Sequence, residues 1–409
     1  MVPPNAPDLS VDEELAVFAK GAVDLIESSE LRARLEQRRK DGKPLAVKLG
    51  ADPSAPDIHL GHTVVLWKMA ELQRLGHEVH FLIGDFTGRI GDPTGRSETR
   101  KQLTPEEIAA NAQTYARQIH KILDPEKTRI DFNSTWLGPM TFADVIGLGA
   151  QYTVARLLER DDFAKRFREG RPIHVHELFY PLMQGYDSVA MRTDVELGGT
   201  DQKFNLLVGR DLQRAHGQRP QIVLTMPLLE GLDGVQKMSK SLGNTVGIDE
   251  APEQMYGKLM SVSDTLMWKY MLLLTDRTAA RVEELKREVA EDRLHPMRVK
   301  EELAARIVST YHGEAGARRG AEEFARVHRK HEAPEKMPGV ALAELGEASV
   351  WIVKLVTRLF GVSGSDARRQ IAAGAVKIDG EKATDDKAEL APRRGMVVQL
   401  GKHRFVRID

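Results

Sequence analysis

Two short segments, far apart in the chain, carry residues that could bind phosphate groups. His59 and His62 lie three positions apart, and Lys237 and Lys240 repeat that spacing later in the sequence. Imidazole N–H groups and lysine ammonium groups both donate hydrogen bonds to phosphate oxygens. The two pairs therefore predict a site for a triphosphate.

The surrounding pattern places the histidines where a strand meets a helix. An apolar run at residues 45–49 predicts the strand, and apolar residues at helical spacing over 61–75 predict the helix. Both histidines then share one face near the helix N-terminus, where backbone N–H groups favour an anion. The lysines belong to a loop that follows an expected strand at 221–226.

Strands and helices alternate over the first half of the chain. Further strands are expected at residues 79–83, 129–132 and 195–197, and Thr104 followed by Pro105 opens another helix. This alternation predicts an α/β fold with a doubly wound, Rossmann-like parallel sheet. Ligands in such folds bind beyond the carboxyl ends of the strands. The Rossmann-like domain is expected over residues 41–247, an N-terminal helical segment over 1–40, an α-helical domain over 248–335 and a small α+β domain over 345–409.

A helix-capping residue and a proline-containing linker support these domain boundaries. Ser10 is the expected N-cap of one charged helix that runs to about Lys40, and a proline-containing linker is expected at 331–339. The last domain is richer in basic than in acidic residues, whereas the whole chain has a formal net charge of -1. A local basic patch is therefore possible, but the whole surface is not that of a nucleic-acid binder.

Composition excludes several classes of protein. The chain has 409 residues, of which 41% are hydrophobic and 29% charged, which is typical of a folded protein with two or three domains. It has no cysteine, so disulfides, thiolate zinc sites and a cysteine nucleophile are excluded. Neither a secretory signal nor an apolar run of membrane-spanning length is visible. We therefore expect a cytoplasmic protein without a membrane anchor.

The histidine and lysine segments together resemble the HIGH and KMSKS signatures of class I aminoacyl-tRNA synthetases. Residues 59–62 have Leu60 in place of the isoleucine, and residues 237–241 match KMSKS letter for letter. Either segment alone could be two surface histidines or a solvated lysine loop, because short motifs have many false positives. Their occurrence in this order, at opposite ends of one α/β domain, favours the resemblance.

The resemblance implies activation of an amino acid by ATP. An ionised carboxylate is already a nucleophile, so the site needs no general base and must align the reactants and stabilise charge. Mg²⁺ would help to hold pyrophosphate, although no cluster identifies its protein ligands and no metal-binding residue is assigned. The residues that the resemblance makes catalytic are His59, His62, Lys237 and Lys240. Those that it places around ATP are Asp52, Ser54, Gly61, Arg96, Gly199, Asp201, Met238 and Ser239, with Arg100 beside Arg96 as a second basic residue for pyrophosphate.

A helical segment near residue 180 indicates which amino acid is activated. Residues 180–187 resemble the amino-acid-binding helix of bacterial tyrosyl-tRNA synthetases, in the subgroup that carries KMSKS. Tyr180, Gln184 and Asp187 share one helical face. The resemblance implies that Tyr180 and Gln184 contact the ammonium group of tyrosine. It also implies that Asp187 accepts a hydrogen bond from the phenol, whereas a packed face of polar residues is the purely structural alternative.

Two more segments fit the tyrosyl pattern and one residue departs from it. Residues 90–96 imply that Asp92 binds the substrate ammonium, although a turn residue before proline is the plain alternative. Residues 197–202 imply that Gln202 contacts the amino-acid moiety or the adenylate. Many tyrosyl enzymes have a tyrosine where this chain has Lys48, and that tyrosine is a second partner of the phenol. No contact is assigned to Lys48.

The C-terminal domain resembles the RNA-binding domain first seen in ribosomal small-subunit protein four. Its basic helix and its Gly-x-Val-x-Ile-Asp-Gly strand and turn correspond to residues 365–371 and 374–380. Arg368, Arg369 and Lys377 would face RNA phosphates. For any one arginine, a solvated basic helix is an equal alternative.

Taken together, the resemblance implies a tyrosine–tRNA ligase that uses L-tyrosine, ATP and tRNA(Tyr) and works as a homodimer. It also implies that the α-helical domain over 248–335 is the anticodon-binding domain, without indicating which residues read the bases. One rival is a tryptophanyl-tRNA synthetase, against which the tyrosyl pattern of Tyr180, Gln184 and Asp187 argues. The other is a synthetase-derived RNA-binding protein that has lost catalysis, against which the intact histidine and lysine pairs argue.

Overall fold

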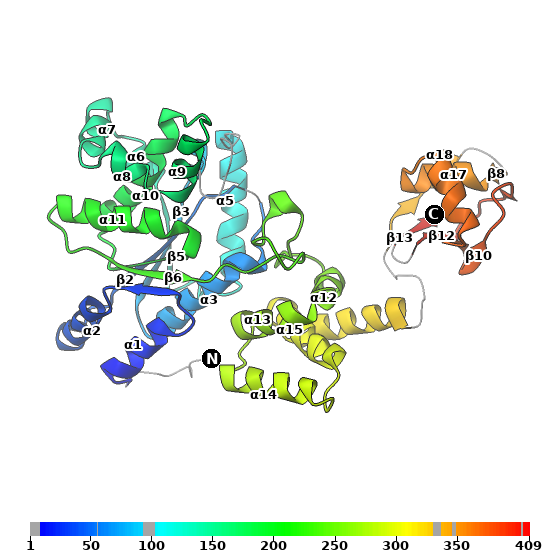
Figure 1. Cartoon of the computed structure of the whole chain (residues 1–409), viewed down its shortest axis with the longest axis horizontal. Helices are drawn as coiled ribbons and strands as arrows, with labels where there is room; N and C mark the ends of the chain where they lie inside the picture. Colours follow the sequence, from blue (N-terminus) through cyan, green and yellow to red (C-terminus); the bar gives the residue numbers. More distant parts are fainter. Residues whose placement is uncertain (1–8, 55, 93–102, 330–336, 346–348, 402–403) are drawn as a thin grey trace. The chain divides into compact units, whose positions relative to one another are not determined.

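The computed structural model describes residues 9–54, 56–92, 103–329, 337–345, 349–401 and 404–409. The chain divides into two compact units (Figure 1). The first unit comprises residues 1–251 and 258–311, and the second comprises residues 252–257 and 312–409. Among the described residues, no helix combines the length and apolar character that crossing a membrane requires.

A six-stranded sheet forms the centre of the first unit. Its strands are β1 (Asp24–Ile26), β2 (Ala46–Ala51), β3 (Glu78–Ile83), β4 (Thr128–Phe132), β5 (Val195–Gly199) and β6 (Ile222–Met226), in the order β1-β6-β5-β2-β3-β4. All neighbours are parallel except β1, which pairs antiparallel with β6. Every residue of β5 and β6 is buried, as expected for a sheet covered on both faces. The predicted doubly wound sheet and its five parallel strands are confirmed.

Helices cover both faces of this sheet. The helices before β5 are α1 (Val11–Ala19), α2 (Ser28–Asp41), α3 (Leu60–Arg74), α4 (Thr87–Ile90), α5 (Pro105–Ile119), α6 (Ser134–Leu137), α7 (Phe142–Gly149), α8 (Val154–Leu157), α9 (Asp161–Arg168) and α10 (Val175–Met191). Those after β5 are the 3₁₀ turn η1 (Thr200–Gln202), α11 (Lys203–Ala215) and the 3₁₀ turn η2 (Lys240–Leu242). Figure 1 shows α10 and α11 on one side of the strands and α1 and α3 on the other. Right-handed crossovers explain this, because β2 to β3 and β5 to β6 step in opposite directions along the sheet.

Local signals set the ends of several helices. The Ser10 hydroxyl and the Glu13 carboxylate form a reciprocal cap at the start of α1, and Thr104 does the same for α5. The expectation of one helix from Ser10 to about Lys40 was wrong. Gly21 adopts the left-handed φ of 72°, which ends the first helical stretch and lets β1 join the sheet edge before α2 begins.

After residue 247 the described chain is helical up to residue 329, as predicted. The elements are α12 (Pro252–Met260), α13 (Asp264–Leu274), α14 (Ala279–Ala290), α15 (Pro296–Phe324) and the π-helical turn η3 (Ala325–Arg329). Gly313 has a φ of 70° and interrupts α15. Both α12 and α15 contain residues of each compact unit. Most of the linker expected at 331–339 lies outside the described residues.

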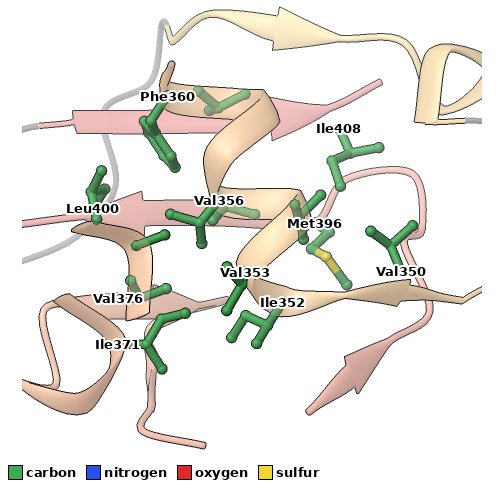
Figure 2. Close-up of a cluster of buried hydrophobic side chains, with 14 of the residues drawn as sticks. Val350, Ile352, Val353, Val356, Phe360, Ile371, Val376, Met396, Leu400 and Ile408 are labelled. Carbon is green, nitrogen blue, oxygen red and sulfur yellow. The ribbon is translucent and has the colours of Figure 1, made fainter. Parts of the chain in front are cut away.

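The C-terminal part of the second unit combines two helices with a small sheet. Its elements are β7 (Gly339–Val340), α16 (Leu342–Leu345), β8 (Val350–Trp351), α17 (Ile352–Phe360), α18 (Gly364–Ala372), β9 (Val376–Ile378), β10 (Glu381–Ala383), β11 (Glu389–Leu390), β12 (Val397–Leu400) and β13 (Arg404–Ile408). The main sheet has the order β10-β9-β12-β13-β7, and β11 pairs with β8. Figure 2 shows Val353 and Val356 of α17 packed among Ile371, Val376 and Leu400. The predicted α+β character is confirmed.

Candidate active site

One cavity of about 940 Å³ lies at the carboxyl ends of β2 and β5 in the first unit. Among the described residues, its walls contain every one predicted to be catalytic, to bind ATP or to bind tyrosine. They are Asp52, Ser54, His59, Gly61, His62, Asp92, Tyr180, Gln184, Asp187, Gly199, Asp201, Gln202, Lys237, Met238, Ser239 and Lys240. Arg96, like Arg100, lies outside the described residues. Segments more than 180 positions apart in the sequence thus meet at one site.

The two histidines stack at the start of α3. Their ring centroids are 3.8 Å apart, and His59 is the N-cap of the helix. The Nδ1 atom of His59 accepts from the Gly61 N–H at 3.2 Å, and the Nδ1 atom of His62 accepts from the His59 N–H at 3.3 Å. Neutral imidazoles that accept at Nδ1 carry their proton on Nε2. Each ring therefore has one N–H donor left for a ligand.

Electrostatics keep both rings neutral. The pKa of His59 is lowered to about 2, chiefly because the surrounding protein excludes water from the ring. The neighbouring His62 and Lys240 lower it further. His62 is exposed within the cavity, and its pKa is also lowered, first by the enclosing protein and then by Lys240 and Lys237. At neutral pH the pair can therefore act as hydrogen-bond donors but not as cations.

Gly61 is required by the close packing of the histidine segment against the lysine loop. A Cβ atom at Gly61 would lie 3.0 Å from the His59 ring and 3.3 Å from the Met238 side chain. Both distances are tighter than ordinary carbon contacts. A larger residue would push apart the histidine segment and the lysine loop, which both line the cavity.

The lysine loop is held by carboxylates that also line the cavity. The Nζ atom of Lys237 lies 2.7 Å from Asp201, and that of Lys240 lies 2.8 Å from Asp57. The lysine side chains are 43% and 30% exposed, respectively. Exposed ion pairs contribute little stability, so phosphate oxygens can replace these carboxylates at small cost.

Asn244 fixes the backbone of this loop. Its Oδ1 accepts from the Ser239 N–H at 2.8 Å, and its Nδ2 donates to the Asp233 carboxylate at 2.6 Å. Met238 adds a buried apolar anchor between the two lysines. The loop therefore has a defined base, while its lysine side chains remain accessible.

Asp187 lines a buried part of the same cavity, here called the buried end, and is 2% exposed. Its carboxylate accepts from the Trp136 indole N–H at 2.8 Å and from the Asn133 side-chain amide at 3.3 Å. Burial raises the pKa of Asp187 to about 7, while Lys48, Trp136 and Asn133 act in the opposite direction. A carboxylate has about four acceptor positions, so an entering hydroxyl could still donate to this one.

Tyr180 and Asp52 connect α10 to the loop after β2. The Tyr180 hydroxyl donates to one Asp52 oxygen at 2.9 Å, and the Thr87 hydroxyl donates to the other at 2.7 Å. Burial, followed by the negative charge of Asp52, raises the pKa of Tyr180 well above its ordinary value. The phenol therefore stays protonated and keeps the Asp52 loop in place.

A buried arginine links the other two expected ammonium contacts. The guanidinium of Arg160 lies 3.2 Å from an Asp92 oxygen and also donates to Asn205 at 3.2 Å. Asn205 in turn donates to Gln184 at 2.8 Å. Asp92 and Gln184 thus present oxygen atoms to one part of the cavity, a suitable setting for an ammonium group. Nearby, Gln202 accepts from the Gly199 N–H at 3.0 Å.

Several residues at the site were not predicted from the sequence. Trp136 and Asn133 hold Asp187, Arg160 and Asn205 hold Asp92 and Gln184, and Asp57 pairs with Lys240. Asn133 directly follows β4, so the rule that ligand sites lie beyond strand ends could have indicated it. The other four lie in helices or loops where no local pattern marks them.

The predicted tRNA contacts lie in the second unit. Arg368 and Arg369 are on α18, and the guanidinium of Arg368 lies 5.2 Å from the centre of the Trp351 ring. Arg369 is 80% exposed and forms an ion pair with Asp366 on its own helix. Lys377 is half-buried in the middle of β9. The two arginines form a basic helix surface, whereas Lys377 belongs to the adjacent sheet.

Comparison with known proteins identifies the family. Residues 40–329 match the class I tRNA synthetases (W and Y), and residues 350–398 match the S4 domain. The tyrosine–tRNA ligase of Moorella thermoacetica is 55% identical over 399 residues, which span 97% of this chain and 96% of that protein. The corresponding ligase of Geobacter metallireducens is 55% identical over 98% of this chain and 99% of its own length.

Solved structures share the fold at lower identity. The tyrosyl-tRNA synthetase of Archaeoglobus fulgidus is 24% identical with a TM-score of 0.62, and the match covers 76% of this chain and 99% of that one. The tryptophanyl-tRNA synthetase of Plasmodium falciparum is 14% identical with a TM-score of 0.58, over 75% and 84% of the two chains. The fold alone therefore does not separate the two specificities, but the sequence relatives do. On their extent and identity, the chain belongs to the tyrosine–tRNA ligases, a family of class I aminoacyl-tRNA synthetases.

Proposed function

We propose that this chain joins L-tyrosine to tRNA(Tyr) in two steps. The first forms tyrosyl-adenylate and pyrophosphate from tyrosine and ATP, and the second transfers tyrosine to the 3′ end of the tRNA. The observation that carries the proposal is that one cavity is lined both by a buried carboxylate, Asp187, and by the partly exposed lysine pair of the KMSKS loop.

At the buried end, the side chain of tyrosine would point toward Asp187. Its hydroxyl would donate to the carboxylate, whose other positions Trp136 and Asn133 already occupy. The ammonium group would contact Asp92, Gln184 and Tyr180. The Arg160 and Asn205 links support this assignment, because they hold two of these acceptors in fixed positions.

At the exposed end, the chain's residues would act on ATP. The tyrosine carboxylate forms a bond to the α-phosphorus while the bond from that phosphorus to the pyrophosphate oxygen breaks. The Nε2–H groups of His59 and His62 would donate to phosphate oxygens as charge develops there. Lys237 and Lys240 would leave Asp201 and Asp57 and hold the departing pyrophosphate.

The remaining ATP contacts follow from the walls of the cavity. Gly199 and Asp201 would face the ribose, and Asp52 with Ser54 the adenylate. Met238 and Ser239 would border the phosphates, with Arg96 on the pyrophosphate. Mg²⁺ would arrive with the nucleotide, since this ion is usually bound through phosphates and water. The described residues contain no group of three or more His, Asp or Glu that could hold a metal ion, so no step is assigned to a protein-bound metal.

The second unit would bind the tRNA. Arg368, Arg369 and Lys377 would contact its phosphates, which fixes position without reading sequence. We further propose that the enzyme is a homodimer and works in the cytoplasm, where the absence of cysteine suits a reducing environment.

The direct test is amino-acid-dependent exchange of labelled pyrophosphate into ATP, followed by charging of tRNA. Tyrosine, tryptophan and phenylalanine are supplied separately. The proposal predicts exchange with tyrosine alone and tyrosine-dependent charging of tRNA(Tyr). Exchange with tryptophan instead would refute the specificity, and a folded chain that binds tRNA without any exchange would refute catalysis.

A further inference from the structure

A lysine with no assigned role lies in the wall of the cavity beside Asp187. Lys48 is in β2 and is 1% exposed, although its side chain still lines the cavity. Its strand neighbour in register is Glu196 of β5, so both side chains point to the same face of the sheet. The Lys48 Nζ lies 2.9 Å from Glu196 Oε1 and donates to the Ser188 hydroxyl at 2.7 Å.

The partners of Lys48 are themselves firmly held. The Ser188 hydroxyl donates to the second oxygen of Glu196 at 3.0 Å, and the Gln221 amide donates to that same oxygen. The ammonium group has three N–H donors, and two of them have partners within the described parts of the chain. The network therefore fixes the position of Nζ and leaves one donor for a ligand.

This donor is close to the carboxylate that we assign to the phenol. Ser188, which accepts from Lys48, directly follows Asp187 on α10, and both Lys48 and Asp187 line the cavity. The charge of Lys48 lowers the pKa of Asp187, whereas the charge of Glu196 raises it. The ammonium group thus lies within electrostatic reach of Asp187 at the same end of the cavity.

Stability alone does not account for an ion pair at this position. Charges that leave water pay a desolvation cost that their attraction often fails to offset, and apolar residues of similar size are commonly as stable. Lys48 and Glu196 lie in the middle strands of the sheet, where neighbouring positions such as Val47 and Leu197 are apolar. A fixed ammonium group at the cavity wall is instead suited to binding a ligand oxygen.

We propose that Lys48 is a specificity-determining residue that donates its third N–H to the phenolic oxygen of tyrosine while Asp187 accepts the phenolic hydrogen. The inference rests on the proposed function and deepens it. A phenol is both a donor and an acceptor, so this arrangement satisfies both properties at once. Phenylalanine would leave a buried ammonium and a buried carboxylate without the partner that tyrosine supplies.

The test compares tyrosine with 4-aminophenylalanine. The amino group of this analogue can donate to Asp187, but its lone pair is delocalised into the ring and accepts hydrogen bonds poorly. Lys48→Met combined with Glu196→Gln removes both charges, so neither is left buried without its counter-ion. We expect kcat/KM for tyrosine in pyrophosphate exchange to fall on the order of 10- to 100-fold. The preference for tyrosine over 4-aminophenylalanine should shrink by at least about tenfold. Only tyrosine has a phenolic oxygen that accepts from Lys48, so only tyrosine loses this hydrogen bond in the variant.

Two controls show whether a loss of preference for tyrosine comes from the Lys48 contact or from a disturbed fold. KM for ATP should stay within about twofold, because Lys48 lies at the tyrosine end. Lys68→Met combined with Glu71→Gln removes another largely buried ion pair, on α3 and outside the cavity walls, and the preference for tyrosine should persist in it. If the double variant does not fold, Lys48→Met combined with Glu196→Met supplies the same measurement, because apolar side chains that replace a buried ion pair are commonly as stable and cannot donate a hydrogen bond.

The possible outcomes distinguish this inference from the proposed function. An active variant that loses tyrosine and 4-aminophenylalanine activity equally would overturn the Lys48 contact and leave the tyrosine ligase assignment intact. Wild-type protein that shows no tyrosine-dependent exchange would overturn both. A loss of preference confined to the Lys48 variants supports the contact.

Discussion

The two ends of the cavity differ in how deeply their charged side chains are buried and in how firmly these side chains are held. At the buried end, where we propose that tyrosine binds, Asp187 is 2% exposed, and one of its oxygens accepts from Trp136 and the other from Asn133. At the phosphate end, the Lys237 and Lys240 side chains are 43% and 30% exposed and each pairs with a single carboxylate. One end is fixed before any ligand arrives, whereas the other holds charges whose partners can change.

If the proposed function holds, this difference assigns the choice of amino acid to the buried end and the reaction with ATP to the exposed end. A buried polar group that loses its partner costs about 1–3 kcal/mol, so a rigid buried end discriminates between amino acids. A solvent-exposed ion pair contributes at most about 1 kcal/mol, so the lysines can move to the phosphates at little cost. We therefore expect variants at the buried end to change substrate affinity and variants at the exposed end to change rates.

The largest effect is expected from Asp187→Ala. The change removes the acceptor for the phenol and leaves the Trp136 and Asn133 donors unpaired, a combined loss of roughly 4 kcal/mol. In pyrophosphate exchange, kcat/KM for tyrosine should fall about 10³-fold while KM for ATP stays within about twofold. Asp211→Ala, which removes a half-exposed carboxylate on α11, is the control and should behave like wild type. An equal loss of ATP binding in Asp187→Ala would refute the division between the two ends.

His62→Ala should produce the next largest effect, at the other end. Loss of one neutral donor to the developing phosphate charge should slow adenylate formation on the order of 10²-fold. Rapid-quench measurement of adenylate under single-turnover conditions reports this rate, and equilibrium dialysis reports tyrosine affinity. Tyrosine should bind unchanged, because His62 lies at the nucleotide end. An unaltered rate would show that His62 has no catalytic role.

The pH dependence of kcat/KM for tyrosine should reveal the buried carboxylate. The raised pKa of Asp187, about 7, means that protonation below neutrality removes the charge that accepts the phenol. Activity should fall by up to about tenfold between pH 8 and pH 6 and reach a plateau above pH 8. The lowered pKa values of His59 and His62 keep both histidines neutral over this range. Asp187→Asn should abolish the dependence, and a variant that retained it would assign the titration to another group.

The smallest effect is expected from Arg368→Ala in the second unit. Loss of one phosphate contact should weaken tRNA binding by a few-fold and reduce the slope of log Kd against log salt by about 1. Nitrocellulose filter binding over a range of salt concentrations measures both. Lys20→Ala, which removes a 68% exposed lysine from the first unit, is the matched control. Equal effects of the two changes would indicate general electrostatics and not a contact made by Arg368.

The same contrast explains what the sequence could predict. The exposed end is encoded by contiguous motifs, so His59, His62, Lys237 and Lys240 were identifiable from spacing and family resemblance, and all four line the cavity. Strand-helix alternation likewise predicted five of the six strands. The missed strand, β1, has only three residues, too few for a pattern, and its position depends on pairing with β6.

The buried end could be predicted only in part. Tyr180, Gln184 and Asp187 recur on one helix face, so their grouping was visible in the sequence. Their partners come from distant segments: Trp136 is 51 positions from Asp187 and Arg160 is 68 positions from Asp92. Long-range hydrogen bonds of this kind have no sequence period. Lys48 illustrates the same limit, because the identity of its partner Glu196 follows from strand register alone.

The most direct test of the account is a single-turnover titration with tyrosine that yields both its Kd and the rate of adenylate formation at saturation. The titration compares wild type with Asp187→Asn, at the buried end, and Lys240→Met, at the exposed end. We expect Asp187→Asn to raise Kd for tyrosine with a nearly unchanged saturating rate, and Lys240→Met to lower the rate with an unchanged Kd. If Lys240→Met weakened tyrosine binding, or Asp187→Asn slowed the saturated reaction as strongly as Lys240→Met does, selection and chemistry would not be divided between the two ends.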